Sequence, residues 1–290
     1  MKNTSNRYLI GMLALVCLVF GCQKEEKITE SLLKTPQIPE NELSDIDLTI
    51  KNDFINPYNI DIIYSWKEAS VDLNRFLVPP RKASITPALK VIKSVWLDPY
   101  TKIGGATFVP NISPREIVLI GNQNFNRSGT ATLGIAEAGA RVTFFETDNL
   151  DLSNADNINR FIGTAQHEYV HILNQTIPFD EQRYGNITPS QYTSQWFNST
   201  ITEARELGFI SNYARLNVRE DFAEMVRIML SNDNKTYNAI IDAIPIVNAR
   251  NLIRQKEAIV ADYYNSELGI DIYELQAEVA KNTLTISNEE

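Results

Sequence analysis

The chain contains only two histidines, and both lie in one short run over residues 166–171, which reads QHEYVH. Residues four apart lie on one face of an α-helix, so the imidazoles of His167 and His171 can reach one metal ion. Glu168, which follows the first histidine, can act as a general base on water beside that metal. Two randomly placed histidines would take this spacing, with a glutamate after the first, in about 0.05% of cases. The alternative, two ordinary histidines on a buried helix face, does not account for the glutamate, so the run predicts a zinc site.

A catalytic zinc ion takes three protein ligands and leaves one position open for water. The chain has no third histidine, and Asn174 and Ile177 stand where the metzincin extension of this motif would need glycine and histidine. We therefore expect a downstream carboxylate as the third ligand, as in thermolysin-type zinc enzymes. The candidates on predicted helical stretches are Glu203, Glu206, Glu220, Asp221 and Glu224.

Among these candidates, Glu220 and Glu224 are four apart and therefore share one helix face. Glu220 can bind the metal, while Glu224 accepts the other ring proton of a histidine and fixes its tautomer. An alternative is that Glu220 only completes a capping box with Asn217. The pair Glu203 and Glu206 ranks second, because it is spaced three apart at the end of a helix.

Hydrophobic periodicity predicts the elements that must position these residues. A 3.6-residue period predicts helices over 155–173, 201–207, 218–230, 247–268 and 270–284, with Gly208 and Gly269 as C-terminal caps. Shorter patterns earlier in the chain predict strands over 60–66, 106–109, 116–120 and 141–146 and a helix over 86–96. Together they predict one α+β domain over 46–290, with a small mixed β-rich half at 46–150 and a helical half at 151–290.

Composition supports a globular domain and argues against nucleic acid as a partner. With 290 residues, of which 43% are hydrophobic, the chain can bury a sizeable core. Its formal net charge is −9, and it has no block of basic residues that could neutralise phosphates.

The first residues have the layout of a secretion signal. Lys2 and Arg7 precede an apolar run over 8–20, which is too short to span a bilayer comfortably. The run ends in VFGC over 19–22, which resembles a bacterial lipobox. We expect residues 1–21 to be a lipoprotein signal peptide that is removed.

Cys22 would then carry a lipid anchor, and the polar stretch over 22–45 would be a flexible tether. The alternative is an ordinary signal peptide with an incidental cysteine. Because Cys17 lies in the removed segment, Cys22 would be the single thiol of the mature chain, and acylation explains its export. The run QKEE over 23–26 resembles a signal that sends some Gram-negative lipoproteins to the outer face of the outer membrane.

Two families of zinc enzymes resemble this arrangement. Tyr213, then Glu220 seven residues later, then FAE over 222–224, resembles the active-site region of anthrax lethal-factor-like proteases. Asp221 departs from that pattern, which has an aromatic residue there. With the lipobox and the β-rich first half, these motifs resemble the substrate import-associated zinc metallohydrolase lipoproteins over nearly the whole mature chain.

The resemblance implies a zincin-like fold, a Zn²⁺ cofactor and a metallopeptidase of the glutamate-zincin type. Members of that family are encoded beside TonB-dependent import systems. The resemblance therefore implies an outer membrane lipoprotein, facing the cell exterior, that acts on peptide or protein substrates with a TonB-dependent import complex as a partner. The rival interpretation is a non-catalytic, zinc-containing substrate-binding or import-accessory lipoprotein. A structural zinc site is normally closed by four ligands, usually with cysteine, which favours the enzyme.

Roles for the remaining residues follow from the chemistry of peptide hydrolysis. Glu168 would take the proton of the attacking water and pass it to the leaving amine. Tyr213 could stabilise the developing oxyanion, or it could be an ordinary half-buried aromatic residue. The predicted strand over 141–146 is the candidate edge for pairing with an extended peptide, unless it is a core strand.

Overall fold

The computed structural model describes residues 39–68, 72, 74–126, 131–132, 134–137 and 140–289. The predicted signal peptide, Cys22 and most of the predicted tether lie outside the described residues. The chain divides into the segment 1–42 and the unit 43–290, and the described part of the first segment holds only the short helix η1 (Glu40–Glu42). No described helix is long and apolar enough to cross a membrane.

Four short strands form the sheet that lies beside the histidine motif. β1 (Asp61–Ile63), β2 (Glu116–Leu119) and β6 (Arg141–Phe144) are parallel neighbours, and β5 (Gly134–Glu137) pairs antiparallel with β6. The parallel strands are rich in isoleucine and valine and are mostly buried, as expected for a sheet covered on both faces. A separate antiparallel pair consists of β3 (Asn124–Phe125) and β4 (Ala131–Thr132).

The strand order β1-β2-β6-β5 corrects one expectation. Of the predicted strand over 141–146, residues 141–144 form β6, but this strand is internal, because β5 pairs with its outer side. The prediction that this segment is the edge for substrate pairing is wrong. β5 was missed because Gly134 and Ala136 have low β-propensity, which leaves Ile135 as its one β-branched residue.

The first half of the unit is more helical than predicted. The expected helix over 86–96 belongs to a longer helical run over 82–104, which includes a π-helical segment over 92–97. Residues 106–109 form no strand, since a helix begins at Phe108. A short apolar run does not distinguish strand from helix by periodicity, which explains the error. The helical segments of this half are α2 (Asp45–Ile50), η2 (Lys51–Ile55), α3 (Asn56–Tyr58), α4 (Lys82–Val91), η4 (Ile92–Leu97), α5 (Asp98–Gly104), α6 (Phe108–Ile112) and η5 (Thr147–Asn149).

The second half is helical, as expected. Gly208 and Gly269 end their helices with positive φ angles of 88° and 66°, which glycine adopts without steric cost. The helices α8 and α11 and two short 3₁₀ turns, η6 (Trp196–Asn198) and η7 (Tyr213–Arg215), were not predicted. The α-helices are α7 (Ala155–Thr176), α8 (Glu181–Gly185), α9 (Ile201–Glu206), α10 (Val218–Leu230), α11 (Asn234–Asp242), α12 (Val247–Ser266) and α13 (Ile272–Asn288).

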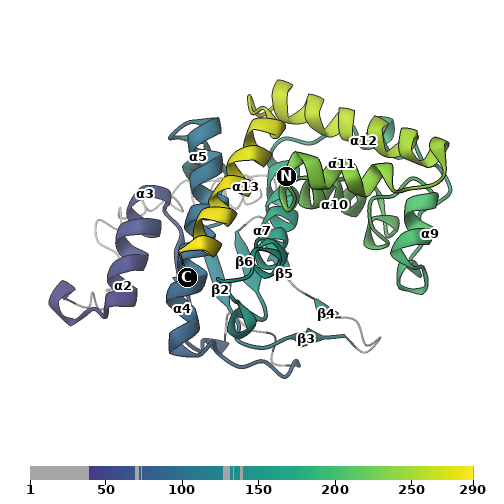
Figure 1. The fold of residues 1–290 in the computed structure, drawn as a ribbon. Coiled ribbons are helices and arrows are strands. Elements are labelled where there is room, and N and C mark those ends of the chain that lie inside the picture. The colour runs from purple at the N-terminus through teal and green to yellow at the C-terminus, as the bar shows by residue number, and fades with distance from the viewer. Residues whose placement is uncertain are drawn as a thin grey trace, which may run out of the picture. The chain divides into compact units, whose positions relative to one another are not determined.

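Helix α7, which carries the histidine motif, lies between the sheet and the helices of the second half (Figure 1). One face of α7 packs against the first half of the unit, and the opposite face carries the two histidines. Tyr169 is 1% exposed and packs edge-on against Trp96 and Tyr100, with ring centroids 5.3 and 5.0 Å away. This aromatic cluster anchors α7 to the first half of the unit, so the histidines point to the other side, where α10 lies.

Candidate metal centre

His167, His171 and Glu220 bring three ligand atoms together. The Nε2 atoms of the two histidines are 3.2 Å apart, and Glu220 Oε2 is 2.9 Å from the first and 3.3 Å from the second. Three tetrahedral ligands at zinc distances of roughly 2.0–2.2 Å would be about 3.3 Å from one another. The separations therefore fit one zinc ion bound by all three side chains, and no other group of this kind occurs among the described residues.

Glu220 reaches this position from the first turn of α10. The side chain of Asn217 caps the helix by accepting the backbone N–H groups of Arg219 and Glu220, at 2.9 and 3.0 Å. The Glu220 carboxylate is not needed for a capping box and points to the histidines instead. Close packing of α7 against α10 also brings Glu220 near the histidines. At this contact a Cβ added at Gly163 of α7 would lie 2.7 Å from Ser231 Oγ at the end of α10.

The charges around the histidines favour a cation. Burial lowers the pKa of His167, but hydrogen bonds to Glu220 and Glu224 and the nearby carboxylate charges outweigh it and raise this pKa to about 10. Burial raises the pKa of Glu220, but hydrogen bonds to both histidines bring it down to about 2. The site thus stabilises a positive charge between anionic carboxylates, which is the place a divalent metal ion would take.

Glu224 holds the other side of the His167 ring. Its Oε1 lies 3.0 Å from Nδ1 of His167, so with a metal bound this contact would keep the proton on Nδ1 and offer Nε2 to the metal. Arg227 donates to both carboxylate oxygens of Glu224, at 2.5 and 2.8 Å, and Ser211 donates to the second one. Burial opposes ionisation of Glu224, but Arg227 and His167 lower its pKa well below the usual range.

Tyr213 lies beside the same imidazole. Its ring centroid is 5.7 Å from that of His167, and Trp196 packs edge-on against its other side at 4.8 Å. The turn that carries Tyr213 is fixed by Ser211, whose Oγ accepts the backbone N–H of Ala214 at 3.2 Å. Burial and the neighbouring carboxylates raise the pKa of Tyr213 well above its usual range, so the phenol keeps its proton.

Glu168 lies under the edge strand of the sheet. A Cβ at Gly134 of β5 would come within 3.2 Å of Glu168 Cγ and 2.2 Å of Thr164 Cγ2. Only glycine allows the strand to pass this close to the helix. The partly buried side chain of Glu168 therefore lies against β5.

The other acidic candidates lie elsewhere in the structure. Glu203 forms a capping box with Thr200 at the start of α9, and neither it nor Glu206 belongs to the cluster with the histidines. Asp221 is fully buried and accepts from Lys256 Nζ at 2.6 Å, in a pair that ties α10 to α12. Burial raises the pKa of Asp221 to about 6 despite the opposing charge of Lys256.

Sequence reasoning missed Ser211, Arg227 and Gly134. The spacing of Arg227, three residues after Glu224 on a predicted helix, was a usable signal, because such residues are neighbours. No local sequence pattern identifies Ser211, because its contact with Glu224 forms only in the folded structure. Gly134 could be found only once the strand was known to cross α7.

We expect Glu220→Ala to weaken zinc affinity far more than Glu203→Ala or Glu206→Ala. Loss of a ligand should exceed the roughly 10- to 100-fold typical of losing an outer hydrogen-bond partner, which is the effect expected for Glu224→Ala. Competition titration with a zinc chelator measures the four affinities. A larger loss in Glu203→Ala than in Glu220→Ala would refute this choice of third ligand.

The chain resembles known proteins in both sequence and fold. Residues 39–273 match the family described as "Putative zinc-binding metallo-peptidase". The crystal structure of a putative zinc-binding metallo-peptidase from Bacteroides caccae is similar, with 31% sequence identity and a TM-score of 0.73, over 87% of this chain and 96% of that one. No match was found among curated proteins.

The matched region contains the histidine motif, Tyr213, Glu220 and Glu224. A family named for zinc binding agrees with the one cluster of metal-binding side chains in the described part of the chain. The chain belongs to this family of zinc-binding metallopeptidases.

Proposed function

We propose that the protein is a zinc-dependent peptidase, with His167, His171 and Glu220 as the metal ligands. The observation that carries this proposal is the tetrahedral spacing of three ligand atoms with Glu168 on the same helix. Three protein ligands leave a fourth position free, which a catalytic zinc needs and a structural zinc does not. Zinc bound there would polarise the scissile carbonyl and lower the pKa of its water.

Side chains of the protein would carry out the remaining steps of peptide hydrolysis. Glu168 accepts the proton of the attacking water and delivers it to the amine that leaves. The phenol of Tyr213 is protonated and donates a hydrogen bond to the carbonyl oxygen as charge develops on it. Glu224, held by Arg227, keeps His167 in the tautomer that offers Nε2 to the metal.

The substrate would lie along β5. This strand is at the end of the sheet, and its outer side has no partner strand in the described part of the chain. An extended peptide can add to such an edge through backbone hydrogen bonds. Because Gly134 lies directly against Glu168, a peptide on this edge has its backbone next to the proposed base.

The proposed location rests on the sequence. A lipid on Cys22 would hold the domain at the outer membrane, and the QKEE run supports its exposure to the cell exterior. At that place the enzyme would supply peptide fragments to a TonB-dependent import complex.

Glu168→Gln should retain zinc and lose peptide hydrolysis, because it removes the base and no ligand. The control is Glu274→Gln, an exposed glutamate of α13, which should stay active. Zinc content and cleavage of a peptide library, read by mass spectrometry, are measured on the same preparations. Equal cleavage by wild type and Glu168→Gln would contradict the assignment of Glu168 as the base, and absence of cleavage by wild type would leave the accessory-protein interpretation.

Tyr213→Phe should lower kcat by about 10²- to 10³-fold with little change in KM, as expected for loss of one oxyanion donor. Tyr273→Phe, which removes a phenol of α13 that donates to Glu257 and lies outside the histidine cluster, is the matched control. Unchanged turnover would remove Tyr213 from the mechanism, whereas lost zinc would assign it a structural role.

Cys22→Ser should release the protein from membranes, because the acyl chains supply most of the anchoring energy. Cys17→Ser should leave the protein membrane-bound. Fractionation of cells expressing each variant compares the two. A membrane-bound Cys22→Ser protein would place the anchor elsewhere.

A further inference from the structure

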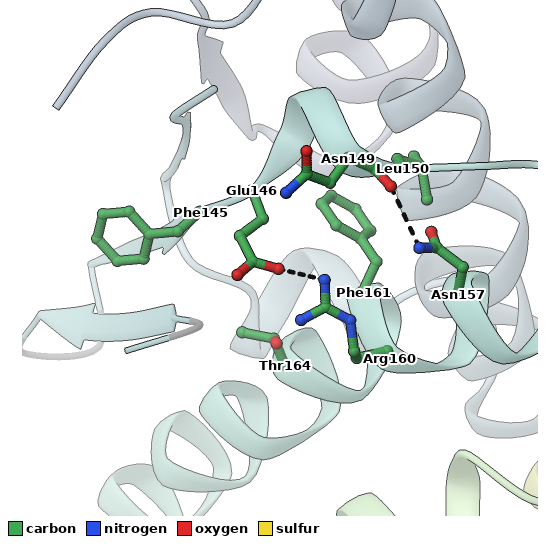
Figure 2. A pocket seen from close by; sticks show the side chains of 8 residues that line it. All are labelled: Phe145, Glu146, Asn149, Leu150, Asn157, Arg160, Phe161 and Thr164. Atoms are coloured by element: carbon green, nitrogen blue, oxygen red, sulfur yellow. Dashed lines mark hydrogen bonds and ion pairs between the residues drawn. The ribbon is translucent and has the colours of Figure 1, made fainter. Parts of the chain in front are cut away.

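The space beside α7, one to two turns before Glu168, is filled by side chains of the protein. Glu146 and Arg160 meet there as an ion pair, and the ring of Phe161 lines the same space (Figure 2). The cavity that remains has room for about one water molecule. A side chain of a bound peptide therefore needs a recognition surface on another side of the histidines.

A row of aromatic rings leads from His167 to the surface on the side of Tyr213. The ring centroids of His167 and Tyr213 are 5.7 Å apart, and those of Tyr213 and Trp196 are 4.8 Å apart. Trp196 in turn meets Phe197 edge-on at 5.9 Å. Trp196 is partly buried and Phe197 is 46% exposed, so the row runs from a proposed metal ligand to solvent.

Trp196 and Phe197, the aromatic pair of η6, do not stabilise a hydrophobic core. Neither belongs to a core cluster in the described part of the chain, and no residue of η6 is buried. A single exposed hydrophobic residue is common and needs no explanation. Two adjacent aromatic side chains that keep exposed surface beside a metal site are instead typical anchors for a ligand.

Polar contacts fix the aromatic pair next to the turn that carries Tyr213. Asn212 donates to the backbone oxygen of Ser199, which directly follows η6, at 3.1 Å. Arg215 donates through Nη1 to Ser199 Oγ and through Nε to the backbone oxygen of Gln191, the latter at 3.3 Å. The pair is thus held at a defined place without core packing. A surface that is ordered before binding loses less conformational entropy when a ligand arrives.

The chemistry of the aromatic pair selects the ligand. Rings whose centroids are about 4.5–7 Å apart attract one another in edge-to-face or offset contacts, as the rings of this row already do. A further aromatic or large apolar side chain would extend the row and cover its exposed end. A cationic side chain could approach the ring faces, but η6, with the sequence WFN, has no acidic residue to form an ion pair with it.

Tyr213 sets the distance from this surface to the bond that is cleaved. Its phenol is the proposed donor to the carbonyl oxygen of that bond, and Trp196 is the next ring, at 4.8 Å. An extended peptide advances about 3.3 Å per residue, so a side chain that packs on Trp196 belongs to a residue within about two positions of the scissile bond.

We propose that Trp196 and Phe197 form a substrate subsite that receives an aromatic or other large apolar side chain. The proposal rests on the proposed function, because it takes Tyr213 as the group that contacts the scissile carbonyl. It assigns Trp196 and Phe197 as specificity residues, both in contact with the substrate side chain.

The test uses the full chain with zinc bound and the Glu168→Gln substitution, so that bound peptides stay intact. A randomised peptide library is selected on this protein, and the retained sequences are read by mass spectrometry. We expect phenylalanine, tyrosine, tryptophan or leucine to be enriched about 10-fold over alanine at one position, since partial burial of one large apolar side chain supplies this discrimination. Absence of any such preference, or enrichment of lysine or arginine instead, would overturn the proposal.

Substitution of the aromatic pair gives a sharper readout. Trp196→Ala and Phe197→Ala should each reduce the enrichment to about 3-fold or less, because part of the apolar surface is lost. In the described part of the chain, Phe197 has a ring contact with Trp196 alone, so Phe197→Ala leaves the packing of Tyr213 in place. The matched control is Trp66→Ala, which removes an exposed tryptophan after β1, the strand at the other end of the sheet from β5, and should keep the original preference.

Zinc content and circular dichroism establish that each variant is folded. An unchanged sequence preference in folded Trp196→Ala and Phe197→Ala proteins would show that the two rings only support their turn, and would overturn the subsite. Cleavage of the same library by the protein with Glu168 intact tests the proposed function separately. Selection without cleavage would remove the peptidase and keep the subsite, and cleavage without selection would do the reverse.

Discussion

The imidazole of His167 lies between two carboxylates of one helix, and the rest of the site depends on this arrangement. Glu220 approaches Nε2 at 2.9 Å and Glu224 approaches Nδ1 at 3.0 Å, one helical turn apart on α10. The first carboxylate shares the metal position with the ring, and the second fixes the ring's tautomer. Both contacts require α7 and α10 to pack closely, which Gly163 permits on one side and the aromatic cluster around Tyr169 supports on the other.

Short-range patterns predicted the parts of this arrangement that lie on single helices. His167, Glu168 and His171 share one helix, and Glu220 and Glu224 share another, so the spacing within each set was visible in the sequence. Their meeting across the fold followed from the chemistry of zinc, which needs a third ligand. Ser211 and Gly134 could not be found in this way, because their roles come from contacts between distant segments.

The errors in the predicted fold have a common physical cause. β5 and the stretch over 106–109 are short, and short segments take their structure from tertiary neighbours more than from local preference. The missed strand matters for the proposed function, since it moves the proposed peptide-binding edge from β6 to β5. That edge passes close to Glu168, so the proposed base lies beside the proposed peptide-binding edge.

X-ray absorption spectroscopy of zinc in the purified protein tests this metal site most directly. We expect one zinc per chain, coordinated by two imidazole nitrogens, one carboxylate and one water oxygen at roughly 2.0–2.2 Å. Replacement of both His167 and His171 by alanine should abolish this zinc. A closed shell of four protein ligands, or zinc retained in the double variant, would contradict it.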